Sequence, residues 1–452
     1  MDKIIKKATK LVGTVTVPGS KSYTHRVLAA ATLAKGTTLI VNPSHSEAND
    51  RMMRACKSLG AIISEEGNSW KVEGCGGRPK PIEHEINVGN SGTALRLSIA
   101  LATIAKNGAI TLTGDKSLQE RPNKPLVDAL IQLGANVKSD CDEGNAPVTV
   151  HTQGLKGGTV SLSGNISSQY LTALLLVSPL ADSDVKIEIT GDIVSKPYIK
   201  MTLEVLDKFK IKVTHDDELR HFSIKAGQQY VSPGVYEIPG DYSQAAFPLA
   251  AGCLISSDII VNGLQEDEQG DKMIISVLED MGAKIDRVKN GFRIRGPFEL
   301  KGVTVDLKQS PDLCPVLAVL GIYAKGTTRL YNMPQIRFKE TDRIAVLMRE
   351  LGNCGVVVTD KFDEMTIQHK ENFKLKENHS FSARGSNHGI TDHRVAMALS
   401  LIAMRDGPAT MEEANRIEIS YPDFFNDMES LYVDNDSVDP TRTGIVAERL
   451  AV

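Results

Sequence analysis

The feature that most constrains the fold of this chain is an internal repeat. Six stretches share one pattern: a polar residue suited to cap a helix, a helix rich in alanine and leucine, a break and a short apolar strand. Successive stretches begin 71, 76, 76, 68 and 80 residues apart. A steady period indicates one supersecondary unit used several times, because each copy buries its apolar face against its neighbours. The stretches begin near Ser20, Ser91, Ser167, Ser243, Pro311 and Thr391.

Each unit also predicts a second, amphipathic helix that starts about 30 residues after the first. Four of these helices end in variants of one phrase: SLGAII, QLGANV, DMGAKI and ELGNCGVVV. Glycine suits the residue after a helix, and the β-branched residues that follow favour a strand. The pattern predicts an α/β protein built from six strand–helix–strand–helix–strand–strand units. The second helices begin near Asn49, Asn123, Tyr198, Asp271, Thr341 and Asp423.

The first helix of each unit is apolar on nearly every side, which indicates that it is buried. Polar residues gather at the amino ends of these helices. A buried helix has to satisfy its free N–H groups at that end, and an anion does this well. If the units pack as two clusters of three, several positive helix ends can face one cleft. The pattern therefore predicts an anion-binding cleft between two domains.

Length and composition exclude several classes of protein. At 452 residues the chain is long for one core, and the best domain boundary lies near residue 238, after residues 231–234 (VSPG). The net charge of −4 argues against a nucleic-acid partner, because phosphate contacts need a basic face. The six cysteines lack metal-ligand spacing, and we find neither a signal region nor an apolar run of about 18 residues. We therefore expect a cytoplasmic protein without a membrane partner.

One charged stretch, residues 337–343 (RFKETDR), places three cations and two carboxylates beside an expected helix start. Such a run is usually a solvated helix face. Here similar groups stand beside glycine- or serine-marked helix starts elsewhere in the chain. A pocket for a substrate with several anionic groups is therefore the better interpretation. The other groups are Lys21, Ser22, Arg26, Arg96, Arg121 and residues 392–394.

These motifs resemble the signatures of the 5-enolpyruvylshikimate-3-phosphate (EPSP) synthase family, in order from about residue 11 to residue 430. The resemblance implies an inside-out pair of α/β domains with three βαβαββ repeats each: residues 18–237, and residues 1–17 with 238–452. It also implies transfer of the enolpyruvyl group of phosphoenolpyruvate to the 5-hydroxyl of shikimate 3-phosphate, in the shikimate pathway of aromatic amino-acid biosynthesis. The motifs are residues 18–26 (PGSKSYTHR), 89–96 (GNSGTALR), 120–122 (ERP), 167–169 (SSQ), 195–198 (SKPY), 338–343 (FKETDR) and 392–394 (DHR).

The resemblance implies roles for individual residues. Both substrates carry a phosphate and a carboxylate, which fixed cations clamp. Asp312 becomes the general base on the 5-hydroxyl, and Glu340, with Lys21, the donor to the methylene carbon. The residues around shikimate 3-phosphate are Lys21, Ser22, Arg26, Ser167, Ser168, Ser195, Tyr198 and Asp312. Those around phosphoenolpyruvate are Lys21, Asn90, Gly92, Arg121, Gln169, Arg343 and Arg394, and Gln335, Lys339 and His393 complete the binding set.

Simpler structural roles stay open for several of these residues. Asp312 follows Ser310-Pro311, which is also a strong helix start. Ser167 and Ser168 suit a plain helix cap. His393 suits either a proton shuttle or a hydrogen-bonded core histidine. Arg96 is left out of the predicted site.

The chain departs from the family pattern at four positions: Ile419 replaces a frequent lysine, Ala48 a frequent acid, Gln335 an expected asparagine and Leu97 a frequent proline. Arg416 and Asp50 are candidate substitutes for the first two. The changes put affinity and inhibitor response in doubt more than the class of reaction.

Three alternatives remain. A sister enzyme that acts on UDP-N-acetylglucosamine has Lys-Asn where this chain has Lys21-Ser22, and a loop cysteine that residues 114–121 lack. A non-catalytic phosphosugar-binding relative and a transferase for another cyclic hydroxy acid are the others.

No metal or organic cofactor is expected, because the chain has no phosphate loop, HExxH or dinucleotide motif. We expect a monomer that closes on shikimate 3-phosphate, with a polar tail at residues 432–452 outside the repeat.

Overall fold

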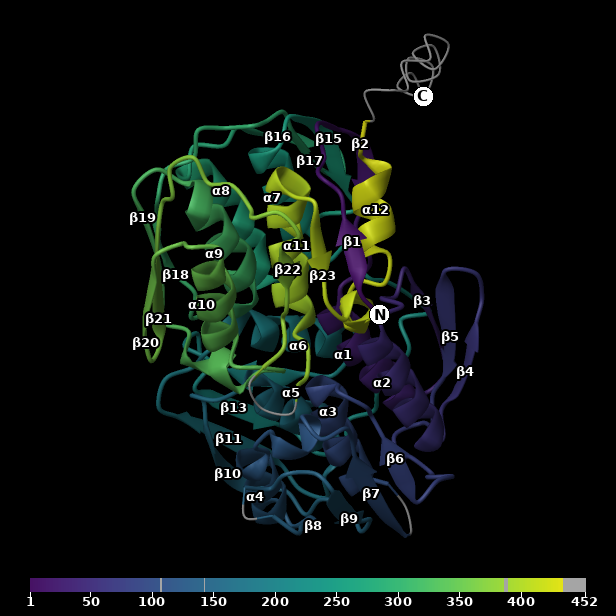
Figure 1. Cartoon of the computed structure of the whole chain (residues 1–452). Coiled ribbons are helices and arrows are strands. Elements are labelled where there is room, and N and C mark those ends of the chain that lie inside the picture. Colours follow the sequence, from purple (N-terminus) through teal and green to yellow (C-terminus); the bar gives the residue numbers. More distant parts are fainter. Residues whose placement is uncertain (106–107, 142, 386–388, 434–452) are drawn as a thin grey trace.

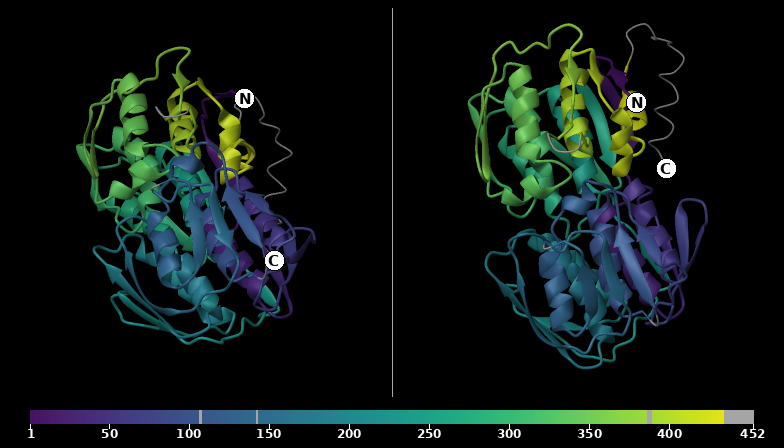
Figure 2. Two further views of the ribbon diagram at one scale, coloured as in Figure 1. Left: turned by 90° about the horizontal axis from the view of Figure 1, so that it is seen from below. Right: turned by 60° about the horizontal axis from the view of Figure 1, so that its bottom comes forward.

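The computed structural model describes residues 1–452 except 106–107, 142, 386–388 and 434–452, so most of the predicted tail lies outside the described residues. The chain forms two stacked halves (Figure 1). The lower half holds the helices and strands between Lys21 and Glu237, and the upper half holds those between Tyr242 and Ser430 together with the strands at Lys3–Ile5 and Leu11–Thr16. Both halves are α/β, as the repeat predicts, and Figure 2 (right) shows them as two bodies that meet across one interface.

Three sheets of the lower half share one strand order. In each sheet one edge strand pairs in parallel with the strand after the first helix, and a hairpin adds two antiparallel strands. In two sheets this edge strand precedes the helix in the chain, whereas in the first sheet it is β14, from the end of the half. The orders are β14-β3-β5-β4, β6-β7-β9-β8 and β10-β11-β13-β12. The strands are β3 (Thr37–Val41), β4 (Ile62–Glu65), β5 (Ser69–Glu73), β6 (Glu85–Asn87), β7 (Ala109–Thr113), β8 (Asn136–Ser139), β9 (Val148–His151), β10 (Gly158–Ser163), β11 (Val185–Thr190), β12 (Val213–His215), β13 (His221–Ile224) and β14 (Val235–Glu237).

The upper half repeats this order twice and then varies it. The orders are β2-β15-β17-β16, β18-β19-β21-β20 and β1-β23-β22. The last sheet has three strands because β1, from the N-terminus, lies antiparallel to β23 where the other units place their hairpin. The strands are β1 (Lys3–Ile5), β2 (Leu11–Thr16), β15 (Ser257–Asn262), β16 (Ile285–Val288), β17 (Gly291–Ile294), β18 (Thr304–Asp306), β19 (Thr327–Tyr331), β20 (Val358–Lys361), β21 (Glu364–Gln368), β22 (Ser380–Phe381) and β23 (Ala409–Met411).

The chain passes between the halves twice, and the two passing segments touch. Strand β2 pairs with β15 in the upper half, whereas β14 pairs with β3 in the lower half. Between them Gly19 and Gly240 form an antiparallel bridge. A Cβ on Gly19 would lie 1.9 Å from the Asn42 carbonyl oxygen, so only glycine allows this approach.

The first helices of the units are buried along almost their whole length, which confirms the prediction from their composition. They are α1 (Lys21–Leu33), α3 (Gly92–Thr103), α5 (Ser168–Val177), α7 (Tyr242–Leu254), α9 (Cys314–Tyr323) and α11 (His393–Asp406). The second helices each bury one face. They are α2 (Glu47–Ser58), α4 (Lys124–Gln132), α6 (Lys196–Lys208), α8 (Ile274–Asp280), α10 (Arg343–Asn353) and α12 (Phe424–Ser430).

The buried apolar side chains form two separate clusters. One runs from Tyr23 to Ile238, and the other combines residues 5–17 with residues 242–431. We therefore propose that residues 18–237 form one domain and residues 1–17 with 238–452 the other. None of the described helices is long and apolar enough to span a bilayer.

Candidate active site

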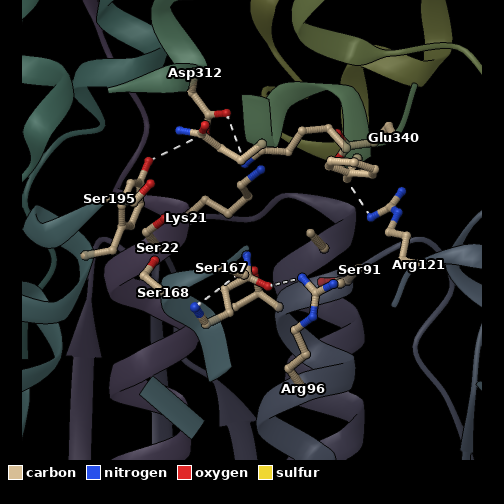
Figure 3. A pocket seen from close by; sticks show the side chains of 18 of the residues that line it. Lys21, Ser22, Ser91, Arg96, Arg121, Ser167, Ser168, Ser195, Asp312 and Glu340 are labelled. Carbon is tan, nitrogen blue, oxygen red and sulfur yellow. Dashed lines mark hydrogen bonds and ion pairs between the residues drawn. The ribbon is translucent and has the colours of Figure 1, made fainter. Parts of the chain in front are cut away.

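A pocket of about 1110 Å³, counting its open mouth, lies between the two halves. Of the residues predicted for the site, all except His393 line it. Figure 3 shows Asp312 and Glu340 on the upper wall and Lys21, Ser22, Ser167 and Ser168 on the lower wall. The structure thus brings together residues that lie more than 300 positions apart in the sequence.

The amino ends of three buried helices open onto this pocket. Lys21, Gly92 and Ser168 are the first residues of α1, α3 and α5, and all three line it. Ser91 accepts a hydrogen bond from Ala94 N, and Ser167 accepts one from Gln169 N, so both serines are helix caps as well as lining residues. Free N–H groups and the helix dipole favour anions at such ends.

Arg26 is held in the lower wall by uncharged groups. Its Nε donates to Thr202 Oγ1 over 2.9 Å, and its Nη2 donates to the Tyr198 carbonyl over 3.1 Å and to Thr172 Oγ1 over 3.3 Å. Its Nη1 donates to the Ser22 carbonyl over 2.8 Å. These four bonds leave one N–H of the guanidinium for a substrate. Burial lowers the pKa of Arg26 to about 10, which leaves it charged at neutral pH.

Arg121 is oriented by Asn90. Its Nη2 donates to Asn90 Oδ1 over 2.7 Å, and its Nη1 donates to the Asn90 carbonyl over 3.2 Å. Asn90 in turn donates from Nδ2 to Asp115 Oδ2 over 2.8 Å. The buried Nε of Arg121 has no partner in the described protein, so a substrate oxygen is its natural acceptor. Gly92 lies beneath this group, and a Cβ there would come within 3.3 Å of Arg121 Nη1.

The upper wall is built around Arg343. Its Nη1 contacts Asp312 Oδ1 at 2.7 Å, its Nη2 contacts Glu340 Oε2 at 3.1 Å and its Nε contacts Asp392 Oδ2 at 2.8 Å. Its side chain is 1 % exposed. One guanidinium thus fixes both predicted catalytic carboxylates and the cap of α11 at once.

Asp312 and Glu340 are both ionised in this arrangement. Burial alone would raise the pKa of Asp312, but the positive charges of Arg394, Lys339, Arg343 and Lys21 outweigh it and hold that pKa well below its usual value. The side chain of Glu340 is 15 % exposed; desolvation would raise its pKa, but the positive charges of Arg121 and Arg343 outweigh this effect and hold the pKa well below the usual range. Both carboxylates are therefore in the deprotonated form, and anions bound beside their cationic neighbours would raise their pKa values.

The pKa values of Lys21 and His393, beside these carboxylates, are both lowered. Burial, followed by the charge of Arg394, lowers the pKa of Lys21 to about 8. His393 is fully buried behind the lining, and neither ring nitrogen has a partner in the described protein. Burial and the charge of Lys21 hold the pKa of His393 well below its usual value, so its ring is neutral. The structure thus places His393 beside the pocket rather than in its wall.

Sequence reasoning missed several lining residues. Arg96, left out of the predicted site, is 8 % exposed, lines the pocket and donates from Nη1 to Gln169 Oε1 over 2.6 Å. Its place one helical turn after Gly92 was the available signal. His25 also lines the pocket, and burial lowers its pKa to about 3. Further lining residues are Ser91, Thr93, Pro122, Ile166 and Phe338.

Three of the four positions that depart from the family pattern line the pocket. Ile419 and Ala48 both line the pocket. Arg416 is exposed and absent from the lining, and Asp50 is absent from it too, so neither stands in for the missing charge in this structure. Gln335 lines the pocket and leaves its buried Oε1 without a partner in the described protein.

One group of possible metal ligands occurs among the described residues: Glu340, Asp392 and His393, whose ligand atoms lie within 4.8 Å of one another. Arg343 already contacts both carboxylates of this group. A metal ion would have to compete with that guanidinium, and the chemistry of the site favours arginine as its cation.

Comparison with solved structures identifies the class first. The enolpyruvyl transferase NikO from Streptomyces tendae shares the fold, with a TM-score of 0.74 over 95 % of this chain and 97 % of that one at 18 % identity. EPSP synthase from Acinetobacter baumannii matches with a TM-score of 0.78 and 25 % identity over 95 % of this chain and 98 % of that one. The fold is therefore one that enolpyruvyl transferases use.

Sequence comparison identifies the family. The family model for EPSP synthase (3-phosphoshikimate 1-carboxyvinyltransferase) matches residues 5–428. A 3-phosphoshikimate 1-carboxyvinyltransferase of Methanococcus maripaludis is 37 % identical over 95 % of this chain and 98 % of its own length, and one of Methanocaldococcus jannaschii is 38 % identical over 95 % and 97 %. The chain belongs to the EPSP synthase family.

Proposed function

We propose that this protein transfers the enolpyruvyl group of phosphoenolpyruvate to the 5-hydroxyl of shikimate 3-phosphate, with release of inorganic phosphate. The observation that carries the proposal is the pocket itself: seven buried or half-buried cations surround two ionised carboxylates between the halves. Both substrates are multiply charged anions, so the cations match their charge. The seven cations are Lys21, Arg26, Arg96, Arg121, Lys339, Arg343 and Arg394.

Asp312 is the general base of the addition step. Its Oδ2 accepts a long hydrogen bond of 3.5 Å from the Tyr198 hydroxyl, which places it above the lower wall where shikimate 3-phosphate would lie. It removes the proton of the 5-hydroxyl as the oxygen attacks C2 of phosphoenolpyruvate. A carboxylate with a low pKa is a weak base, so its role depends on close alignment with the hydroxyl.

Glu340 protonates the methylene carbon in the same step, which gives a tetrahedral ketal. Its neighbours Arg121 and Arg343 are the cations that the phosphate and carboxylate of phosphoenolpyruvate would offset, so substrate binding raises the pKa of Glu340 from its low starting value. Lys21, with a pKa of about 8, supplies the proton that Glu340 donates. The resulting carboxylate of Glu340 then takes a proton back from the methyl group as phosphate leaves, which restores the double bond.

Phosphate release from phosphoenolpyruvate tests the function directly. The wild type should release phosphate with shikimate 3-phosphate and stay silent with UDP-N-acetylglucosamine. Asp312→Asn should lower kcat about 10²- to 10⁴-fold, because a general base contributes on that scale. Silence of the wild type with both acceptors would reject the proposal and favour a different cyclic hydroxy acid or a binding protein.

We also propose that the protein acts as a monomer in the cytoplasm, and that its halves close on shikimate 3-phosphate. All six cysteines are free, which suits a reducing compartment. The lining comes from both halves, so a bound substrate would bridge them. Small-angle scattering tests both points: the mass should match one chain, and the radius of gyration should fall on addition of shikimate 3-phosphate.

A further inference from the structure

Beside the pocket the two halves meet in a contact whose residues, apart from Ser195, have no part in the proposed chemistry. The lower half contributes residues 195–197 at the start of α6. The upper half contributes Gly270 and residues 308–310, just before the short 3₁₀ helix that carries Asp312. We call these residues the clasp.

Two backbone N–H groups at the start of α6 find their acceptors in the other half. Lys196 N donates to the side-chain Oε1 of Gln309 over 2.6 Å. Ser195 N donates to the Lys308 carbonyl over 3.1 Å. The first N–H groups of a helix have no partner within the helix, and Ser195 makes no side-chain cap bond. Gln309 therefore supplies, from the upper half, the cap that α6 lacks.

The clasp also holds a strained residue. Ser195 has φ of +57° and lies in the left-handed region, which a residue with a Cβ adopts at a cost of about 1 kcal/mol or more. Such strain persists only where the surroundings impose it. Here the surroundings are the Lys308 carbonyl and Gln309, and the strained residue lines the pocket.

Gly270 lets the segments of the clasp approach each other. A Cβ on this residue would lie 2.9 Å from the Gln309 carbonyl oxygen, 2.9 Å from Pro197 Cγ and 3.0 Å from Ser310 Oγ. These are closer than real Cβ contacts allow, so any larger residue would push the halves apart at this point.

The clasp joins the two parts of the proposed site. Two residues after Lys196 comes Tyr198, and three residues after Gln309 comes Asp312; these side chains meet at 3.5 Å. We propose that Gln309 is a positioning residue, which couples the shikimate 3-phosphate subsite at Ser195 and Tyr198 to the placement of Asp312. The proposal rests on the proposed function. It predicts that occupation of the subsite and correct placement of the base depend on each other.

The test compares Gln309→Ala with a matched control. Loss of one such hydrogen bond is expected to lower kcat/KM for shikimate 3-phosphate about tenfold. KM for phosphoenolpyruvate at saturating shikimate 3-phosphate should change less than about twofold, since Arg121, Arg343 and Arg394 are untouched. Gln309→Glu keeps an acceptor at the helix start and should restore most of the loss.

The control is Gln228→Ala. Gln228 Oε1 accepts from Lys212 N over 2.8 Å, a bond of the same kind that lies within the lower half. This variant should match the wild type in both kinetic constants. Gly270→Ala, which crowds the clasp without removing a bond, should reproduce the kinetic pattern of Gln309→Ala.

Unchanged kcat/KM in Gln309→Ala would overturn the coupling, as would an equal loss in Gln228→Ala. A purely structural role for Gln309 would lower the thermal midpoint without the split between the two substrates, and this also overturns the proposal. If the wild type releases no phosphate, the proposed function fails on its own. Calorimetry with shikimate 3-phosphate then decides the role of Gln309: a dissociation constant equal to that of the wild type contradicts it, and a weaker one supports it.

Discussion

The two walls of the pocket hold their cations in different ways. In the lower wall Arg26 is bound by hydroxyl and carbonyl oxygens. Arg121 is bound by an amide and a carbonyl, with Glu340 Oε1 at a longer 4.0 Å from its Nη1. In the upper wall Arg343 contacts three carboxylates. Positive charge in the lower wall therefore remains available to a ligand, whereas in the upper wall it is balanced within the protein.

The pKa values of the two arginines express this difference. Burial without a countercharge lowers the pKa of Arg26 to about 10, whereas Asp392, Asp312 and Glu340 overcome the effect of burial and hold the pKa of Arg343 well above its usual value. The two walls therefore have different roles. The lower wall attracts anions, and the upper wall keeps two carboxylates ionised and oriented for proton transfer. Four predictions test this contrast between the walls.

The largest effect is expected for Arg343→Met. The change leaves Asp312, Glu340 and Asp392 buried without their shared cation, so stability should fall by about 3–5 kcal/mol and phosphate release should become undetectable or nearly so. Denaturant unfolding and an assay of phosphate release measure both. Arg329→Met removes an arginine from a surface pair with Glu364 and should cost less than about 1 kcal/mol. Equal losses in the two variants would contradict the role given to the upper wall.

Arg26→Met comes next. It leaves the hydroxyls of Thr172 and Thr202 without their guanidinium partner, and we expect about 1–3 kcal/mol of destabilisation, less than for Arg343→Met. KM for shikimate 3-phosphate should rise about 10- to 100-fold, because a charge-assisted contact is lost, while kcat falls less. Steady-state kinetics with each substrate varied in turn measures this. A fall in kcat with unchanged KM would place Arg26 in the chemistry instead.

The pH profile gives a third, smaller effect. Lys21 binds anions as a cation, and its charge is lost as pH rises through its pKa of about 8. The value of kcat/KM for phosphoenolpyruvate should therefore be flat below pH 8 and fall above it, by at most about tenfold per pH unit. The fall should be absent from the residual activity of Lys21→Met. A profile that stays flat to pH 9.5 in the wild type would argue that another group supplies the cation.

The smallest effect is expected for Ile419→Lys. It adds an unpaired cation to the pocket at the position where the family often has lysine, and KM for phosphoenolpyruvate should fall about two- to fivefold. Ile419→Met, which conserves volume without charge, is the control and should leave KM near the wild-type value. If the lysine variant binds no better than the methionine variant, the upper wall already has the charge it needs.

Much of the fold could be predicted from the sequence because the patterns that specify it are local. The period of the six units, the apolar first helices and the glycines after the second helices each depend on a few neighbouring residues. Gly60, for example, follows α2 with φ of +102°, as the phrase SLGAII predicts. Motif order then gave most of the pocket lining; His393 lies beside the pocket, and Arg96, which was left out of the predicted site, lines it. The predicted roles of the remaining residues await the experiments above.

The α/β repeat, the burial of the first helices and the family all follow from local patterns in the sequence. Three features appear only in the folded chain: β1 completes the last sheet, one arginine contacts three carboxylates, and Gln309 caps a helix in the other half. The difference is one of distance. Propensity and capping act between residues a few positions apart, whereas ion pairs, desolvation and cross-half hydrogen bonds act over a few ångströms between residues far apart in the chain, and no local pattern records which of them will meet.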